Sequence, residues 1–311
     1  MSTARLLLTI LYSVWLLLVT LLTALILYLL LRHSPKSFQT FRFLLADSAI
    51  FQLLTLASSY FNQMGLVTNA TPIAALSHGL CRFCPPSVCF VSYLFGIMFV
   101  WLSSTAIFST FYFKYISLVS PIITTSRVVK FMILIHFPAL ILLGLEIWMY
   151  FELSPTFPTH PQLDVSEFLL VLLFPSSSKS YQTTFFLMTV CSVFFPMICW
   201  YLRRRILQEL NMRMTRMSMT KRVNHKLFVT GLSIQIVVPI IVYPVTFGIF
   251  YYCVYQDLEL PGPDLSLFLI AGIPALADPI ISLYFVAPFR KVLSSWLFSS
   301  KSEVTAVSKS F

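Results

Sequence analysis

Long apolar runs follow one another along this chain of 311 residues, and they constrain its fold more than any other feature. The first runs from Leu6 to Leu31 and is interrupted by few polar side chains, all of them Thr, Ser or Tyr. About 20 consecutive apolar residues are enough for a helix to cross the hydrocarbon core of a bilayer. Only 10% of the residues are charged, against roughly 25% in soluble domains. The pattern therefore predicts an all-α membrane protein.

We expect a single membrane domain over 1–311, built as a seven-transmembrane helix bundle. Its helices are predicted at about 6–31, 43–64, 88–116, 131–151, 181–202, 227–252 and 265–286, followed by a short tail over 287–311. Arg5 gives the first run the look of a signal peptide, but the run exceeds the roughly 7–15 apolar residues of a cleavable one. It is therefore predicted to stay in the protein as the first helix.

Basic residues concentrate in alternate connections between the predicted helices. Eighteen of the 21 Lys and Arg residues fall in one set of connections and in the tail, whereas Arg5, Arg82 and Lys179 fall in the other set. Because cytoplasmic loops carry the excess of Lys and Arg, the N-terminus is predicted outside and the C-terminus in the cytoplasm. The net charge of +10 is then explained by topology, and no nucleic-acid partner is expected.

Three acidic residues, Asp47, Glu146 and Asp278, lie within predicted helices. A charge at mid-bilayer costs about 2.5–3.5 kcal/mol on insertion scales, so such residues usually face the bundle interior. If the second and seventh helices are neighbours, Asp47 and Asp278 could share a proton, a cation or ordered water, either as a packing network or as a switch between states. A catalytic aspartate dyad is the weakest alternative. Glu146 is expected to reach the membrane surface together with Glu152, with a counter-charge for a ligand as the alternative.

Prolines mark the last two predicted helices at Pro239, Pro244, Pro274 and Pro279. Proline removes a backbone hydrogen bond and kinks a helix. These positions are therefore candidate hinges for a bundle that opens on its cytoplasmic side, although kinks can equally serve only to shape the bundle.

The segment predicted to follow the second helix on the outside contains candidate modification sites. His78, Cys81 and Cys84 have metal-ligand spacing, but a structural zinc site needs four ligands and external thiols tend to oxidise. A disulfide among Cys81, Cys84, Cys89 and Cys253 is the preferred interpretation. Loop 152–180 contains no Cys, so a disulfide from the third helix to this loop cannot form. Asn69 begins an Asn-Ala-Thr glycosylation sequence, which Pro72 would make a poorer acceptor.

The connection between the fifth and sixth helices is strongly basic. Its charges alternate with Met, Leu and Ile, which predicts helical extensions of both helices with a basic face. Such a face could bind a G protein or anionic lipid head groups. The residues expected to contact a G protein are Lys114, Arg203, Arg204, Arg205, Lys221 and Arg222.

Four ordered segments resemble the serpentine receptor class delta family of nematode chemoreceptors. They are Ser77–Tyr93 with its His-Gly-Leu-Cys, Ser109–Tyr115, Gly231–Pro239, and the segment from Pro274 through Asp278-Pro279 to Arg290. The resemblance implies a chemosensory G-protein-coupled receptor in the cell membrane, in sensory neurons and so in the ciliary membrane. It would bind a small molecule among the outer halves of helices three, five, six and seven and signal through a heterotrimeric G protein.

The chain departs from familiar receptor patterns at positions expected to switch. Lys114 stands where the family tends to have Arg, and Lys lacks the planar fork that holds a carboxylate bidentately. No Asn-Pro-x-x-Tyr follows in the seventh helix, since Tyr284 is the next Tyr after Pro279. The expected switch residues are nevertheless Asp47, Lys114, Asp278 and Pro279.

Three other functions remain as alternatives. A transporter or channel would show internal repeats or a continuous polar stripe, and neither is recognised in the sequence. A membrane enzyme would carry a nucleophile or metal motif, and no phosphate loop, HExxH or G-x-S-x-G is present, so no enzymatic activity and no cofactor are expected. The third alternative is an orphan receptor that no longer signals.

Overall fold

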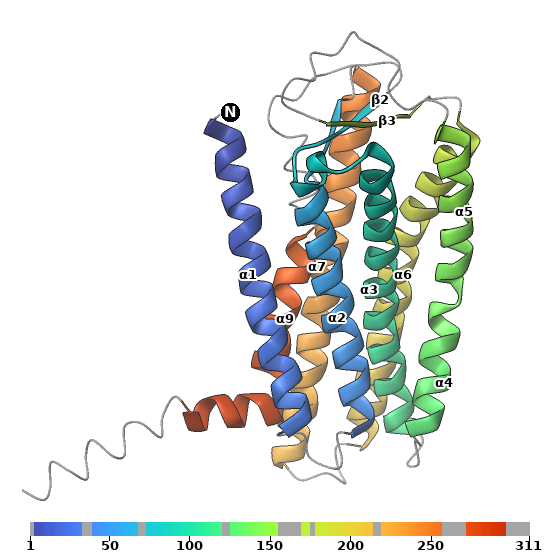
Figure 1. The fold of residues 1–311 in the computed structure, drawn as a ribbon. Coiled ribbons are helices and arrows are strands. Elements are labelled where there is room, and N and C mark those ends of the chain that lie inside the picture. The colour runs from blue at the N-terminus through green and yellow to red at the C-terminus, as the bar shows by residue number, and fades with distance from the viewer. Residues whose placement is uncertain are drawn as a thin grey trace, which may run out of the picture.

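The computed structural model describes residues 3–32, 39–67, 73–119, 125–154, 169–174, 178–213, 219–256 and 272–296. The helices are α1 Thr3–Arg32, α2 Gln39–Asn62, α3 Pro86–Val119, α4 Thr125–His136, α5 Pro138–Leu153, α6 Lys179–Arg213, α7 Met219–Gln256 and α9 Ile273–Phe285. A short 3-10 helix, η2, covers Leu80–Phe83, and the strands are β1 Met64–Val67, β2 Ile73–Ser77 and β3 Leu169–Phe174. The long helices stand side by side in a bundle (Figure 1).

The bundle presents apolar side chains to its surroundings. Along α4 and α5, Ile133, Leu134, Leu140 and Ile141 are each at least 59% exposed, which suits contact with lipid and not with water. Within the described residues, six spans are long and apolar enough to cross a membrane, and α9 is a shorter apolar helix. The predicted all-α membrane bundle is thereby confirmed, with a small sheet added at one end.

The interior, by contrast, collects polar side chains along one face of α2. Ser48, Gln52, Thr55, Ser58 and Asn62 are all at most 9% exposed. They recur every three or four residues, so they lie on one side of the helix. No full polar stripe was predicted, and this one covers α2 only from Ser48 to Asn62, since the buried side chains of the preceding turn, Leu44 and Leu45, are apolar. We call these five residues the α2 polar stripe.

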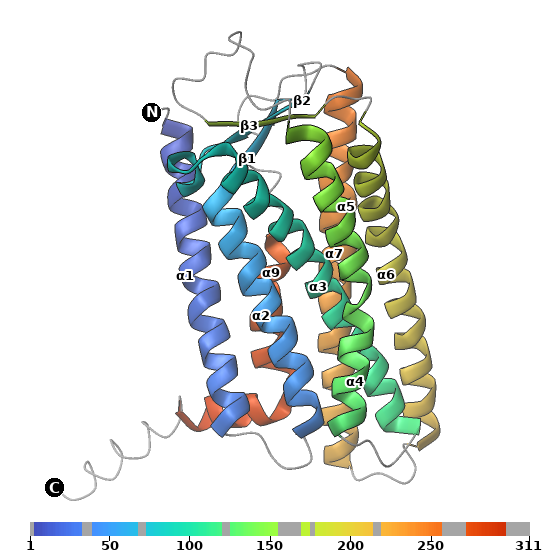
Figure 2. The same cartoon turned by 45° about the vertical axis from the view of Figure 1, so that its right-hand side comes forward.

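The predicted fourth helix is broken into two segments. Pro138 has no backbone N–H and takes the first turn of α5. The regular α-helical hydrogen bonding is interrupted at Phe137, although the backbone angles there remain helical. This is the position at which proline interrupts a helix. α4 and α5 follow one another along the same side of the bundle (Figure 2). Together they begin earlier and end slightly later than the predicted 131–151.

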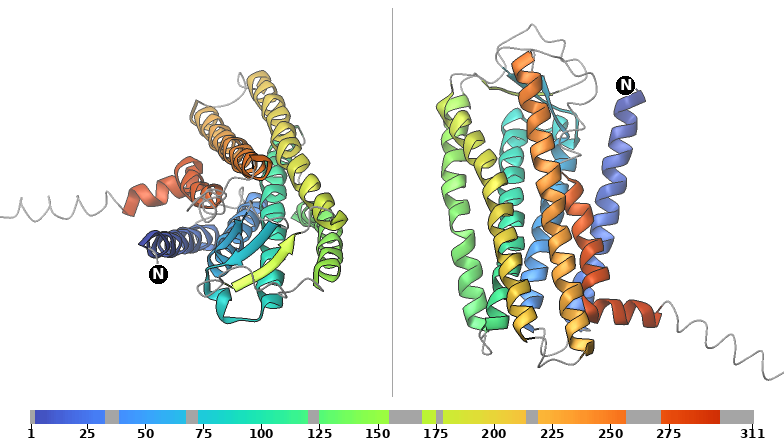
Figure 3. Two further views of the ribbon diagram at one scale, coloured as in Figure 1. Left: turned by 90° about the horizontal axis from the view of Figure 1, so that it is seen from above. Right: turned by 180° about the vertical axis from the view of Figure 1, so that it is seen from behind.

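A three-stranded antiparallel sheet covers one end of the bundle, where the sequence predicted only loops. β2 lies in the middle, with β1 on one side and β3 on the other; Ala75, for example, is opposite both Leu66 and Leu172. Seen from above, the strands lie over the ends of α2 and α3 (Figure 3). β3 belongs to loop 152–180 and is held to the hairpin after α2 by backbone hydrogen bonds with β2. We call this the sheet end.

The opposite end, which we call the basic end, is extended by helix. α6 continues to Arg213 and α7 begins at Met219, so the predicted helical extensions are confirmed. The tail predicted over 287–311 opens with a further helix at 287–296, which lies across the bundle axis (Figure 1).

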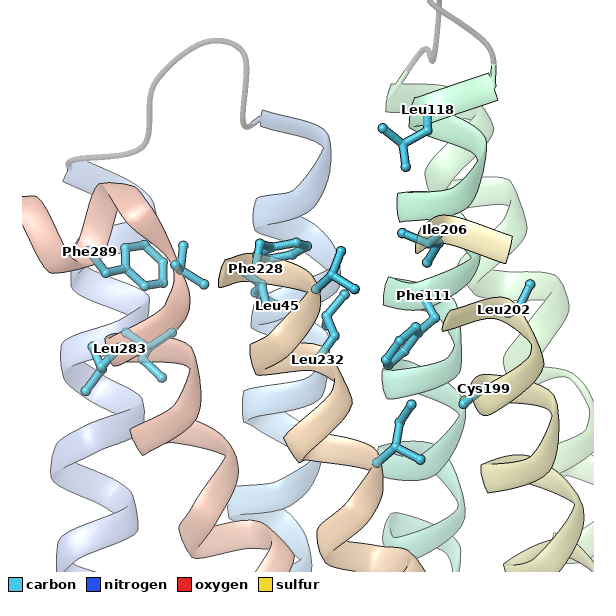
Figure 4. Close-up of a cluster of buried hydrophobic side chains, with 14 of the residues drawn as sticks. Leu45, Phe111, Leu118, Cys199, Leu202, Ile206, Phe228, Leu232, Leu283 and Phe289 are labelled. Atoms are coloured by element: carbon cyan, nitrogen blue, oxygen red, sulfur yellow. The ribbon is translucent and has the colours of Figure 1, made fainter. Parts of the chain in front are cut away.

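The largest apolar cluster lies toward the basic end (Figure 4). Phe111 of α3 is fully buried there, together with Leu45 of α2, Phe228 of α7 and Leu283 of α9. Phe289, from the helix at 287–296, joins the same cluster. Side chains from all these elements therefore close the bundle between its polar interior and the basic end.

Candidate functional site

A cavity of about 230 Å³ lies between α2, α3, α6 and α7, with contributions from Met64 of β1 and Met149 of α5. It extends from the sheet end toward the middle of the bundle. Its wall is mainly apolar and aromatic, and α2, α3, α6 and α7 each contribute polar residues to it. The lining residues include Thr55, Ser58, Asn62, Tyr93, Val100, Trp101, Tyr181, Thr184, Phe185, Pro196 and Pro239. The lining residues come from α2 and from three of the four helices on which ligand binding was predicted, α3, α6 and α7, whereas the fourth, α9, contributes none.

Three polar atoms on lining residues are buried without a hydrogen-bond partner among the described residues. They are Asn62 Oδ1, Trp101 Nε1 and Thr184 Oγ1. An unsatisfied buried polar atom costs about 1–3 kcal/mol. These acceptor and donor groups lie behind the cavity surface, and a bound molecule could satisfy them once their side chains turn toward it.

Prolines border the cavity on two helices. Pro196 lies inside α6 and Pro239 inside α7, and both line the cavity. Pro196 was overlooked in the sequence, although it interrupts an apolar run. Pro244 and Pro279 also lie inside helices, as predicted, whereas Pro274 belongs to the first turn of α9 and breaks no helix there.

Asp278 is the centre of a buried network that joins three helices. Its carboxylate accepts hydrogen bonds from Ser48 Oγ of α2, at 3.1 Å, and from Gln235 Nε2 of α7. Gln235 Nε2 also donates to Ser282 Oγ of α9 at 3.2 Å. Gln52 Nε2 donates to Ser48 Oγ at 3.4 Å, so the lower part of the α2 polar stripe belongs to this network. The hydrogen bonds link α2, α7 and α9.

Close packing brings α7 to α9 beside this network. Gly231 lies one turn before Gln235, and a Cβ at Gly231 would come within 2.5 Å of Phe285 Cβ. A larger residue at Gly231 would push α7 away from α9 and lengthen the hydrogen bonds that Gln235 donates to Asp278 and Ser282. The recognised segments around Gly231 and Asp278 thus meet in space, which the sequence alone did not reveal.

Asp47 does not join Asp278 and has a different partner. Its Oδ2 lies 2.9 Å from His136 Nε2 of α4, and His136 Nδ1 lies 2.9 Å from Thr105 Oγ1 of α3. Thr105 Oγ1 also donates to the Leu102 carbonyl at 2.9 Å, so the histidine ring links α2 to α3 through Asp47 and Thr105. The two carboxylates that were predicted to share a proton, a cation or water therefore have different partners: Asp47 contacts His136, and Asp278 contacts Ser48 and Gln235. The signal missed was a histidine inside an apolar run.

Glu146 is buried, contrary to the expectation that it reaches the surface. Its side chain is 1% exposed, and neither carboxylate oxygen has a hydrogen-bond partner among the described residues. Ala139, Leu142 and Met149 on the same face of α5 are also buried. The prediction failed because depth along a helix does not tell which way a side chain faces.

The basic residues expected to meet a G protein are in different settings. Lys114 is 6% exposed, and its ammonium lies 4.8 Å from the ring centroid of Phe228 and 5.6 Å from that of Phe41. Arg203 donates to Ser233 Oγ at 2.6 Å. Arg204 and Arg205 are exposed. For Lys221 and Arg222 the structure describes the backbone alone, as part of α7.

Cys81 and Cys89 form a disulfide between η2 and α3. Cys84 is a free thiol, the side chain of Cys253 is not described, and Asn69 lies outside the described residues. With its sulfur in a disulfide, Cys81 cannot serve as a zinc ligand. Gly79 of the His-Gly-Leu-Cys segment packs so tightly that a Cβ would come within 2.2 Å of the Phe61 carbonyl oxygen.

An apolar-surfaced bundle with buried polar networks and a cavity between its helices is the architecture of a serpentine membrane receptor. The family model for serpentine type 7TM GPCR chemoreceptors, Srd, matches residues 8–295, and the chain belongs to this family.

Individual relatives from Caenorhabditis elegans agree with this assignment. Serpentine receptor class delta-40 is 27% identical over 292 residues, 92% of this chain and 91% of the relative. Serpentine receptor class delta-45 is 27% identical over 301 residues, 94% of this chain and 93% of the relative. The resemblance recognised in the sequence is therefore confirmed over nearly the whole chain.

Proposed function

We propose that this protein is a chemosensory receptor that binds a small organic ligand in the cavity and activates a heterotrimeric G protein at the basic end. The sheet end would face outside and the basic end the cytoplasm, since 18 of 21 Lys and Arg residues belong to connections at the basic end or to the tail. Location in the cell membrane, and in the ciliary membrane of sensory neurons, is part of the proposal.

The cavity carries the proposal. Concave, mainly apolar sites with a few polar groups are typical of small-molecule binding. A volume of about 230 Å³ is below the roughly 300–1,000 Å³ of many ligand pockets, which favours a compact ligand. Asn62, Trp101 and Thr184 supply unsatisfied polar atoms.

The α2 polar stripe offers a route from ligand to switch. Thr55, Ser58 and Asn62 line the cavity, while Ser48 and Gln52, on the same face, belong to the Asp278 network. A ligand shifts a bundle equilibrium only by its difference in affinity for the two states. Contacts between the ligand and the cavity wall that strengthen when α7 moves at Pro239 would supply this difference in affinity.

Coupling would require the basic end to open. Phe228 of α7 covers Lys114 in this conformation, so Lys114 would reach a G protein only after α7 moves away. Arg204 and Arg205 are already exposed. With Arg203, Lys221 and Arg222 they would form the rest of the docking surface, and Asp47 and Pro279 would take part in the switch.

A pair of matched substitutions tests the cavity. Val100 lines the cavity, so Val100→Trp should fill it and weaken ligand-induced cAMP or calcium responses at least about tenfold. Val91 lies on the same helix, is 39% exposed and does not line the cavity, so Val91→Trp should respond normally. Responses would be recorded with a panel of small organic compounds at matched surface expression. Equal responses of both variants would refute the cavity as the binding site.

The α2 polar stripe also gives a specific reason to test a transporter or channel. Below the stripe, however, the apolar cluster around Phe111 and Phe228 closes the bundle. Ion flux into liposomes containing the protein without any G protein would favour this alternative. Absence of flux together with nucleotide exchange on an added G protein would favour the receptor.

A further inference from the structure

We infer that the ligand is a small organic amine, bound as an ammonium ion whose counter-charge is Glu146. This inference rests on the proposed function, because it names the chemical class of the molecule in the same cavity. The inference goes beyond the proposed function because it assigns a role to Glu146 of α5, which lies in none of the recognised motifs.

Glu146 is a carboxyl group at a position where packing calls for an apolar side chain. The buried face of α5 is otherwise Ala139, Leu142, Met149 and Leu153, each at most 5% exposed. Both carboxylate oxygens are buried without a hydrogen-bond partner among the described residues. Ionisable residues inside a bundle are costly and usually serve function. Among the described residues this carboxyl has no hydrogen-bond partner, and a ligand could supply one.

The carboxyl lies next to the cavity wall. Met149, one turn along α5, lines the cavity. Tyr93 of α3 also lines it and lies within electrostatic range of both Glu146 and Tyr181. Glu146 itself is not a lining residue, so binding would turn its carboxylate toward the ligand between Tyr93 and Met149.

The surrounding side chains suit an ammonium ion. Tyr93, Tyr181 and Phe185 line this part of the cavity, and the rings of Tyr181 and Phe185 stack with centroids 5.8 Å apart. Aromatic faces attract cations, and aromatic cages bind ammonium groups. Thr184 Oγ1, one turn from Tyr181, has no partner among the described residues and could accept a second N–H. The ligand's apolar remainder would occupy the rest of the cavity.

Binding to the purified chain in lipid nanodiscs tests the inference with matched probes. The probes are isoamylamine and phenethylamine, each compared with its alcohol, isoamyl alcohol and 2-phenylethanol. Each amine should bind at least about tenfold more tightly than its alcohol. Glu146→Gln should weaken amine binding about 100-fold, as expected for loss of one partner of a buried ion pair, and leave alcohol binding within about threefold.

Two further variants separate a binding role from a structural one. Glu152→Gln removes the same charge from the same helix at a carboxylate that already accepts from the Ser180 backbone N–H, and amine binding should persist. Glu146→Leu completes the apolar face, so it should raise the thermal stability of the ligand-free protein while abolishing the preference for amines. A Glu146→Leu variant that is less stable would instead assign Glu146 a structural role and overturn the inference.

The remaining outcomes are equally decisive. If neither amine binds more tightly than its alcohol, or if Glu152→Gln weakens amines as much as Glu146→Gln, the inference fails. Alcohol binding that Val100→Trp abolishes would still support the cavity of the proposed function. Probe binding that Val100→Trp leaves intact would refute that cavity as well, so the two failures are distinguishable.

Discussion

Near the sheet end, α2, α3, α6 and α7 enclose a cavity of about 230 Å³, whereas toward the basic end the same helices pack into an apolar cluster. The cavity half holds unsatisfied polar atoms on Asn62, Trp101 and Thr184. In the other half Phe111 is fully buried, and even the cation of Lys114 lies against aromatic rings. The difference indicates that one half leaves interactions for a ligand to complete, while the other holds the bundle closed.

The Asp278 network lies where the two halves meet. It connects α2, α7 and α9 through Ser48, Gln235 and Ser282, whereas Asp47 connects α2 to α3 and α4 through His136. Asp278 depends on neutral donors from separate helices, and Asp47 faces a histidine that can carry the opposite charge. The Asp278 network is therefore better placed to change when α7 moves.

The largest effect is expected from truncating the closed half. Phe111→Ala should lower the free energy of unfolding by about 3–5 kcal/mol, because it removes a fully buried ring from a packed cluster. Phe185→Ala in the cavity wall should cost about half as much, since that ring already borders empty space. Thermal unfolding in detergent measures both. Equal losses would mean that the two halves are packed alike.

The disulfide should have an intermediate effect confined to the sheet end. Cys81→Ser with Cys89→Ser should destabilise the protein by about 2–3 kcal/mol, through loss of a cross-link over a short loop. Hydrogen exchange should rise in β1, β2 and η2 and remain unchanged around Phe111. Cys84→Ser, which removes a free thiol from the same segment, is the control. Faster exchange around Phe111 would contradict the independence of the two halves.

The smallest effect on stability is expected at Lys114. Replacing a buried charge by an apolar side chain of similar length is often neutral or stabilising, so Lys114→Met should change the unfolding free energy by no more than about 1 kcal/mol in either direction. G-protein activation should nevertheless fall, if Lys114 becomes exposed in the signalling state. Lys114→Arg keeps the charge and should retain activation. Full activation by Lys114→Met would remove Lys114 from the coupling surface.

Local features of the sequence predicted much of the fold. Each long apolar run became a helix or part of one, because a buried-in-lipid backbone must satisfy its hydrogen bonds within the segment. The break in the fourth helix could also have been predicted, because Pro138 lies inside the apolar run and proline interrupts helical hydrogen bonding. The strand at Leu169–Phe174 was missed because a short apolar run becomes a strand only where a partner such as β2 is available.

The candidate site could be predicted only in part. Asp278, Gln235 and Gly231 lie within segments recognised in the sequence, but their meeting across α7 and α9 depends on helix packing. The partner of Asp47 was not predicted, because His136 is 89 residues away along the chain.

The sequence by itself determined that the chain is a membrane helix bundle of the Srd family, because apolar length and recognisable segments are properties of consecutive residues. Tertiary structure decided which side chains meet inside. It paired Cys81 with Cys89, aligned the α2 polar stripe with the cavity, and turned Glu146 inward. The physical reason is that the rotation of each helix about its axis is set by packing against its neighbours, and a one-residue change rotates a side chain by about 100°.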